Sequence, residues 1–135
     1  MQYMLLIYGN DTEWEQRSDE EKAAIYDEYR VVSESSGIKA GAELQPAETA
    51  TTVRVQNGET LTTDGPFTEA KEVLGGYWMI QVRSRDEAIA WATRCPASAN
   101  EVIEIRQVQE FTDFPPDVQK EVAAFPDLMP QDRRS

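Results

Sequence analysis

The run Asp64–Phe67 (Asp-Gly-Pro-Phe) combines an acid with residues that build tight turns, and more charge follows at Glu69, Lys71 and Glu72. Asp64 stands at the end of a strand-like segment. A carboxylate in that position can act as a general base if it faces a cleft, because partial burial raises its pKa from about 3.9 towards neutrality. Asp64 is therefore the candidate catalytic residue.

The same four residues also have a purely structural interpretation. Asp accepts hydrogen bonds from backbone amides in turns, Gly bends freely, Pro fixes φ, and an aromatic side chain anchors the loop. Phe67 is then either that anchor or a ligand contact, and both interpretations stay open. Glu69, Lys71 and Glu72 are expected on a solvated surface, and Gly75-Gly76 is expected at a β-bulge or a close approach of two backbones.

Three more polar residues are candidates for ligand contacts. Glu104 and Arg106 share one face of a strand-like segment with Val102 and Val108, so they must be solvated, paired or lining a cavity. If a dimer encloses such a cavity, Arg106 would hold an anion or a carbonyl group and Tyr8 would donate its hydroxyl. An exposed strand would show the same residues, and this alternative also stays open.

The composition excludes several kinds of catalytic and metal-binding site. The 135 residues include no histidine and one cysteine, so an imidazole base is excluded and a metal site would need oxygen ligands alone. The Asp/Asn/Gly spacing of a calcium loop does not occur, and we expect neither a metal nor a cofactor. Cys95 lies on the apolar side of a helical pattern and is expected to be a buried thiol.

The charge balance bears on partners and location. A net charge of −12, from 25 acidic and 13 basic residues, argues against direct binding to nucleic acid. The apolar runs fall far short of the ~20 residues that a membrane helix needs. The first basic residue is Arg17, so a secretory signal is not expected at the N-terminus, and we expect a cytoplasmic protein.

Hydrophobic periodicity, capping boxes and turn residues predict the elements that position these candidates. Trp78, Met79 and Trp91 are expected in the core. In chain order, the predicted elements are a strand (Tyr3–Tyr8), a helix between Ser18 and Gly37, a strand (Ile38–Leu44), a hairpin about Asn57-Gly58 (52–55 and 59–62), a strand that begins after the double glycine (Tyr77–Val82), a helix (Ser84–Cys95) and a strand (Val102–Val108).

This order predicts a ferredoxin-like βαββαβ domain of the α+β class, with an inserted β-hairpin, over residues 1–109. Two helices can cover only one face of the sheet, so we expect a second copy to bury the other face and form a homodimer. Residues 110–135 would form a C-terminal extension with a short helix near Pro116, because Val118, Val122 and Phe125 recur at helical spacing. We expect this helix to lie over the body or to reach the other subunit.

Several segments together resemble the DGPF branch of the YCII-related family. They are Tyr3–Gly9, Ala50–Arg54, Thr63–Phe67 with Glu69 and Lys71-Glu72, Gly75–Tyr77, Ala90–Ala92, Cys95-Pro96 and Glu104–Arg106. The resemblance covers about residues 1–109, and several motifs in the same order make it specific. It implies a ferredoxin-like fold that dimerises into an α+β barrel.

The resemblance implies less about activity, because most members have no assigned reaction and a fold does not define a function. The case for an enzyme in the wider family rests on a histidine and an aspartate that face a cleft, with a dehydrochlorinating member as the example. Asp64 matches the aspartate of the DGPF motif. Asn100-Glu101 stands where relatives often have His-Gly, and Asn100 can form hydrogen bonds but cannot take a proton at neutral pH.

Three functions therefore stay open. In the leading hypothesis a small polar or aromatic molecule binds in a cleft near Asp64, and the contacts are Tyr8, Arg106, Glu104, Phe67 and Asn100. The first alternative is a lyase similar to a dehydrochlorinase, with Asp64 as general base and Arg106 stabilising negative charge in the transition state. The second is a non-enzymatic module that captures a protein through its acidic surface or its tail, since some relatives occur beside or fused to extracytoplasmic-function sigma factors.

Overall fold

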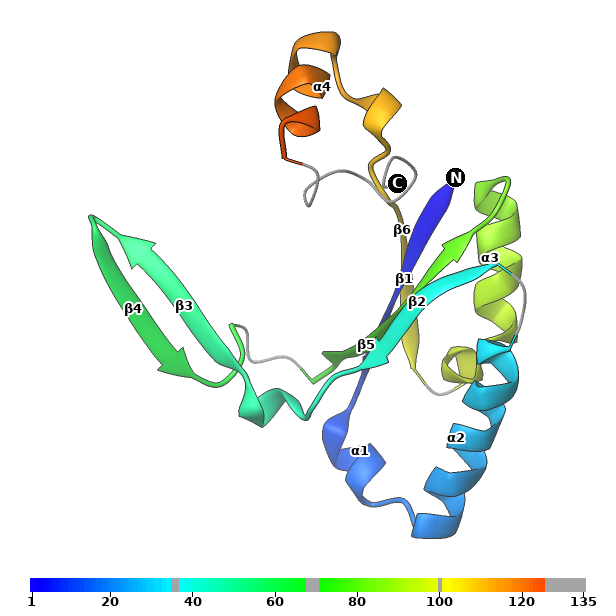
Figure 1. Ribbon diagram of the computed structural model, residues 1–135. Helices are drawn as coiled ribbons and strands as arrows, with labels where there is room; N and C mark the ends of the chain where they lie inside the picture. The colour runs from blue at the N-terminus through cyan, green and yellow to red at the C-terminus, as the bar shows by residue number, and fades with distance from the viewer. Residues whose placement is uncertain (35–36, 68–70, 100, 126–135) are drawn as a thin grey trace.

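The computed structural model describes residues 1–34, 37–67, 71–99 and 101–125, with the backbone alone at 98 and 99. Figure 1 shows a central sheet, a projecting hairpin and helices on one side of the sheet. In chain order the strands and helices are β1 (Gln2–Gly9), α1 (Asp11–Glu15), α2 (Asp19–Ser33), β2 (Ile38–Glu43), β3 (Thr51–Gln56), β4 (Glu59–Asp64), β5 (Val73–Gln81), α3 (Arg85–Arg94), β6 (Val102–Gln107) and α4 (Pro116–Ala123).

The main sheet has the strand order β2-β5-β1-β6, and every neighbouring pair is antiparallel. With α2 joining β1 to β2 and α3 joining β5 to β6, this is the ferredoxin-like arrangement of two split βαβ units. Strands β3 and β4 form a separate two-stranded sheet that projects from the body (Figure 1). The predicted fold class, including the inserted hairpin, is confirmed.

Both long helices begin where the capping boxes predict. The Ser18 hydroxyl oxygen accepts a hydrogen bond from the backbone amide of Glu21 at 3.1 Å, and Ser84 does the same for Glu87 at 3.1 Å. The apolar faces of these helices cover one side of the sheet, where Leu5 is completely buried. The core is therefore built between α2, α3 and the central strands β1 and β5.

Strand β5 begins earlier than the sequence predicts. It starts at Val73, before the double glycine, and its register against β1 shifts between Ile7 and Tyr8. The expected bulge at Gly75-Gly76 is therefore confirmed, whereas the expectation that the strand begins after the double glycine is wrong. A Cβ atom on Gly76 would lie 2.7 Å from the carbonyl oxygen of Ala42, so Gly76 allows β2 and β5 to pair closely.

None of the described helices lies over the face of the sheet opposite α2 and α3 (Figure 1). Strand registers place one set of side chains on this uncovered sheet face. The set consists of Met4, Leu6, Tyr8, Leu74, Tyr77, Met79, Val102, Glu104 and Arg106. Trp91 lies in the core as expected and Trp78 packs against it, but Met79 points to the uncovered face.

The C-terminal helix α4 begins at Pro116, as the sequence predicts. It stands beyond the end of the sheet and does not lie over either face (Figure 1). Val118 on this helix is 40% exposed, and Phe125, just beyond its end, is 57% exposed. None of the described helices is long and apolar enough to span a membrane.

Candidate functional site

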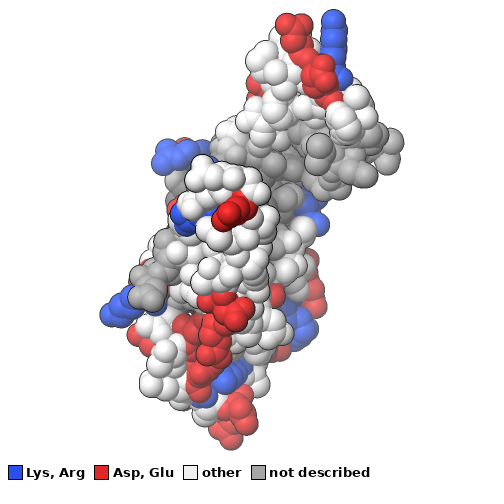
Figure 2. Space-filling model, turned by 90° about the vertical axis from the view of Figure 1, so that its left-hand side faces the viewer, with Lys and Arg blue, Asp and Glu red and all other residues white. Residues whose placement is uncertain are grey.

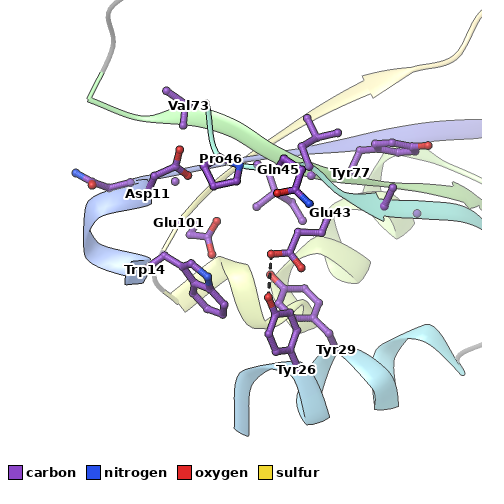
Figure 3. A pocket seen from close by; sticks show the side chains of 18 of the residues that line it. Asp11, Trp14, Tyr26, Tyr29, Glu43, Gln45, Pro46, Val73, Tyr77 and Glu101 are labelled. Atoms are coloured by element: carbon purple, nitrogen blue, oxygen red, sulfur yellow. Dashed lines mark hydrogen bonds between the residues drawn. The ribbon is translucent and has the colours of Figure 1, made fainter. Parts of the chain in front are cut away.

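An open cavity of about 610 Å³ lies on the helix side of the sheet, where β1 ends. We call it the Glu43–Glu101 cavity, after two carboxylates that reach it from opposite parts of the chain (Figure 3). Its chemistry comes from four acids (Asp11, Glu13, Glu43 and Glu101), five aromatic residues (Trp14, Tyr26, Tyr29, Tyr77 and Trp78) and Arg17. A cavity of this size is in the range that holds small ligands.

Helix α1, which was not predicted from the sequence, forms one wall of the cavity. Asn10 caps it, because its side-chain oxygen accepts hydrogen bonds from the backbone amides of Thr12 and Glu13 at 2.9 and 3.2 Å. Asp11 accepts a hydrogen bond from the backbone amide of Ala47 at 2.8 Å, which ties α1 to the connection between β2 and β3. These contacts hold Trp14 at the cavity.

Two glycines make room for side chains at the cavity. A Cβ atom on Gly41 would lie 2.5 Å from the Trp78 ring, so the absence of a side chain lets this indole lie across β2. The Trp78 ring stacks on Tyr29, with centroids 6.2 Å apart and planes inclined by 27°. At Gly9, a Cβ atom would lie 2.6 Å from a carboxylate oxygen of Glu101.

The acids and tyrosines influence one another's protonation. The Tyr26 hydroxyl donates a hydrogen bond to Glu43 at 2.9 Å, and burial together with this contact raises the pKa of Tyr26. Burial raises the pKa of the Glu101 carboxyl; Arg17 opposes this shift and the negative charge of Glu43 adds to it. Burial, with Cys95, Glu101 and Glu43 adding to it, raises the pKa of Tyr29 far above its ordinary value. The raised pKa of Glu101 reflects a carboxyl that is partly removed from water and close to another negative charge.

A second cavity, of about 550 Å³, lies beside the Asp-Gly-Pro-Phe turn. Tyr8, Pro66 and Phe67 line it, so the structure brings together two of the predicted contact residues. The segment Leu44–Pro46 and Val73 line both cavities, which therefore adjoin across the connection between β2 and β3.

The Asp64–Phe67 turn closes the base of the hairpin. The backbone amide of Gly65 donates to the carbonyl oxygen of Ala50 at 2.7 Å, and the Thr52 hydroxyl donates to the carbonyl oxygen of Gly65 at 2.8 Å. Gly65 has φ of +103°, which favours glycine. Phe67 is 71% exposed, with the Arg54 guanidinium 5.3 Å from its ring centroid. Asp64 itself is exposed, and it lines neither described cavity.

The remaining predicted residues lie elsewhere. Glu104 and Arg106 are exposed on β6, opposite Leu6 and Met4, so they share the uncovered sheet face with Tyr8. Asn100 lies outside the described residues. Within one chain, Asp64 is on the hairpin and the other described candidates are divided between the second cavity and the uncovered sheet face.

Sequence reasoning missed most of the Glu43–Glu101 cavity. It noted Glu101 only as a departure from relatives, and it did not single out Trp14, Tyr26 or Glu43. One local signal was present, because Asn10 followed by Asp11 and Glu13 is a capping residue before an acidic first helical turn. Cys95 is 1% exposed, as expected for a structural thiol, and burial raises its pKa.

Three comparisons relate the chain to known proteins. An uncharacterised protein of Rhizobium meliloti is 34% identical over 96 residues, which is 68% of this chain and 77% of that protein. The structure of 5-chloro-2-hydroxyhydroquinone dehydrochlorinase from Burkholderia phenoliruptrix, in complex with 2,5-dihydroxybenzoquinone, matches 82% of this chain and 95% of that one, with a TM-score of 0.46 and 13% identity. So distant a match carries no information on activity. The family model of the YCII-related domain matches residues 1–112, and the chain belongs to this family.

Proposed function

We propose that this protein is a homodimer that binds a small organic molecule in the Glu43–Glu101 cavity. The observation that supports this most is the convergence of polar and aromatic side chains from α1, α2, β2 and Glu101 on one open cavity of about 610 Å³. Ligand sites typically combine apolar and aromatic walls with a few convergent polar groups. The sequence alone favours a cleft near Asp64, and the second cavity beside the turn is the competing location.

A pair of aromatic truncations distinguishes the two cavities. Hits from a fragment library would be mapped by ¹H–¹⁵N NMR and titrated against Trp14→Ala and Phe67→Ala. We expect Trp14→Ala to weaken binding about tenfold or more, because it removes a wall of the Glu43–Glu101 cavity, whereas Phe67→Ala leaves affinity unchanged. The reverse pattern would place the ligand beside the Asp64 turn and overturn this proposal.

A lyase reaction is the second candidate, with Asp64 as the general base that the sequence suggests. Its support is the position of the turn, which contributes Pro66 and Phe67 to a cavity that adjoins the first one. A single chain leaves Asp64 exposed, so the base would have to be enclosed by a second chain. If Asp64→Asn turned over a candidate substrate as fast as the unaltered protein, this candidate would be eliminated.

A further inference from the structure

The Glu43–Glu101 cavity has an excess of negative charge. Asp11, Glu13, Glu43 and Glu101 line it, and Arg17 is the one basic residue among the described lining residues. Within the described parts of the chain, Arg17 forms no ion pair shorter than 4.0 Å with these acids. Asp and Glu side chains also gather over the lower half of the surface seen in Figure 2. The field in the cavity therefore favours a positively charged group.

Glu43 and Glu101 face the interior of the cavity. Asp11 accepts a hydrogen bond from the backbone of Ala47 and Glu43 accepts one from the Tyr26 hydroxyl, and the Glu43 and Glu101 side chains point into the same space, between Trp14 and the two tyrosines (Figure 3). Burial raises the pKa of Glu101, and the charge of Glu43 adds to this shift. A cation placed between the two carboxylates would relieve both the repulsion and the loss of hydration.

The aromatic walls favour the same type of ligand. Trp14 and Tyr26 meet edge to face, with ring centroids 5.4 Å apart and planes inclined by 81°. The Trp14 ring already has the cationic groups of Arg17 and Lys22 at 5.9 and 5.8 Å from its centroid. Aromatic faces attract organic cations and also provide area for an apolar body. In the described residues, no three acids or cysteines lie close enough to hold a metal ion together.

We propose that the Glu43–Glu101 cavity binds a protonated primary amine carried on an aromatic or apolar body. The ammonium group lies between the carboxylates of Glu43 and Glu101, and the body packs against the aromatic walls. A neutral ligand would add no positive charge to the stabilisation that Glu43 receives from the Tyr26 hydroxyl and Glu101 from Arg17, and an anion would be repelled. This inference rests on the proposed function, because it names the ligand class of the same cavity.

Three probes of similar shape test the charge preference: 2-phenylethylamine, 2-phenylethanol and 3-phenylpropionate. Affinities would be measured by ¹H–¹⁵N NMR titration near neutral pH, where the amine is protonated. We expect the amine to bind about tenfold or more tightly than the alcohol and the anion to bind more weakly than either. If the alcohol binds in the cavity as tightly as the amine, the inference is overturned while the proposed function stands.

Charge-neutral variants test the assigned carboxylates. Glu43→Gln and Glu101→Gln should each weaken binding of the amine about tenfold and leave the alcohol unaffected, because the amide keeps the shape of the side chain without its charge. Glu59→Gln is the matched control, since it removes one negative charge from the exposed hairpin strand β4. Equal losses in all three variants would mean that only the net charge matters, and that result would overturn the inference. An amine that does not bind overturns it as well, and the fragment mapping then decides the proposed function separately.

Discussion

Gly65 is the residue of the Asp64–Phe67 turn whose role follows directly from geometry. Its backbone amide and carbonyl group both bond to the segment Ala50–Thr52, and its φ of +103° is strained for any residue with a side chain. Asp64 contributes an exposed side chain. In one chain, the turn interpretation of this motif therefore has a structural basis, whereas a catalytic role for Asp64 depends on a partner that encloses it.

The two residues can be separated by substitution. Gly65→Ala should accelerate amide hydrogen exchange across β3 and β4 about tenfold, because a side chain at this φ costs about 1–2 kcal/mol. Asp64→Asn should change exchange by less than about twofold, since exposed substitutions are usually worth less than about 0.5 kcal/mol. Equal acceleration in both variants would show that the Asp64 side chain holds the turn.

The main residues of the candidate site could not be predicted from the sequence. Trp14, Glu43 and Glu101 belong to segments separated by about thirty to sixty positions, and they meet only because β2, β5, β1 and β6 pair in one sheet. Their types, spacing and flanking residues resemble those of an ordinary solvated surface. The Asp64 motif was found because its turn chemistry is local, and this made it more visible than the cavity.

At the scale of elements, strands and helices with a long periodic pattern or a strong cap were predicted well. Capping boxes predicted helices α2 and α3. The Asn57-Gly58 pair predicted the hairpin, and its two residues have the positive φ values, 52° and 79°, that such a turn requires. Helix α1 was missed because five residues are too few to show a helical period. The start of β5 was misplaced because glycine usually weakens a strand, and here the close pairing with β2 overrides that preference.

Gly75 and Gly76 provide a matched test of this pairing. A Cβ atom on Gly76 would lie 2.7 Å from the backbone oxygen of Ala42, whereas on Gly75 the nearest atom is 3.9 Å away. We expect Gly76→Ala to lower the free energy of unfolding by about 2–3 kcal/mol, because backbone must shift to accept it. Gly75→Ala should cost less than about 1 kcal/mol. Urea denaturation at a fixed protein concentration measures both, and similar losses would mean that the bulge, not the approach of β2, requires glycine.

For the whole molecule, the main feature is the uncovered sheet face, which none of the described helices of a single chain buries. Met4, Leu6 and Met79 are half-buried there, and Val102 is 49% exposed. Apolar side chains on a sheet face without a covering layer favour burial against a partner. A symmetric homodimer would cover this face with its own copy, so each substitution enters the interface twice.

We therefore expect Leu6→Asp to convert the proposed homodimer into a monomer, with a dissociation constant raised about a hundredfold or more, because two unpaired carboxylates would be buried. Val31→Asp is the control, since Val31 is 58% exposed on α2, away from the uncovered face. Light scattering coupled to size-exclusion chromatography gives the mass, and circular dichroism verifies folding. If Leu6→Asp loses its fold, Val102→Asp replaces it, because that side chain is 49% exposed in the single chain and tolerates a charge there. A folded Leu6→Asp protein that remains dimeric, or an unaltered protein that is monomeric at micromolar concentration, would show that this face is not the dimer interface.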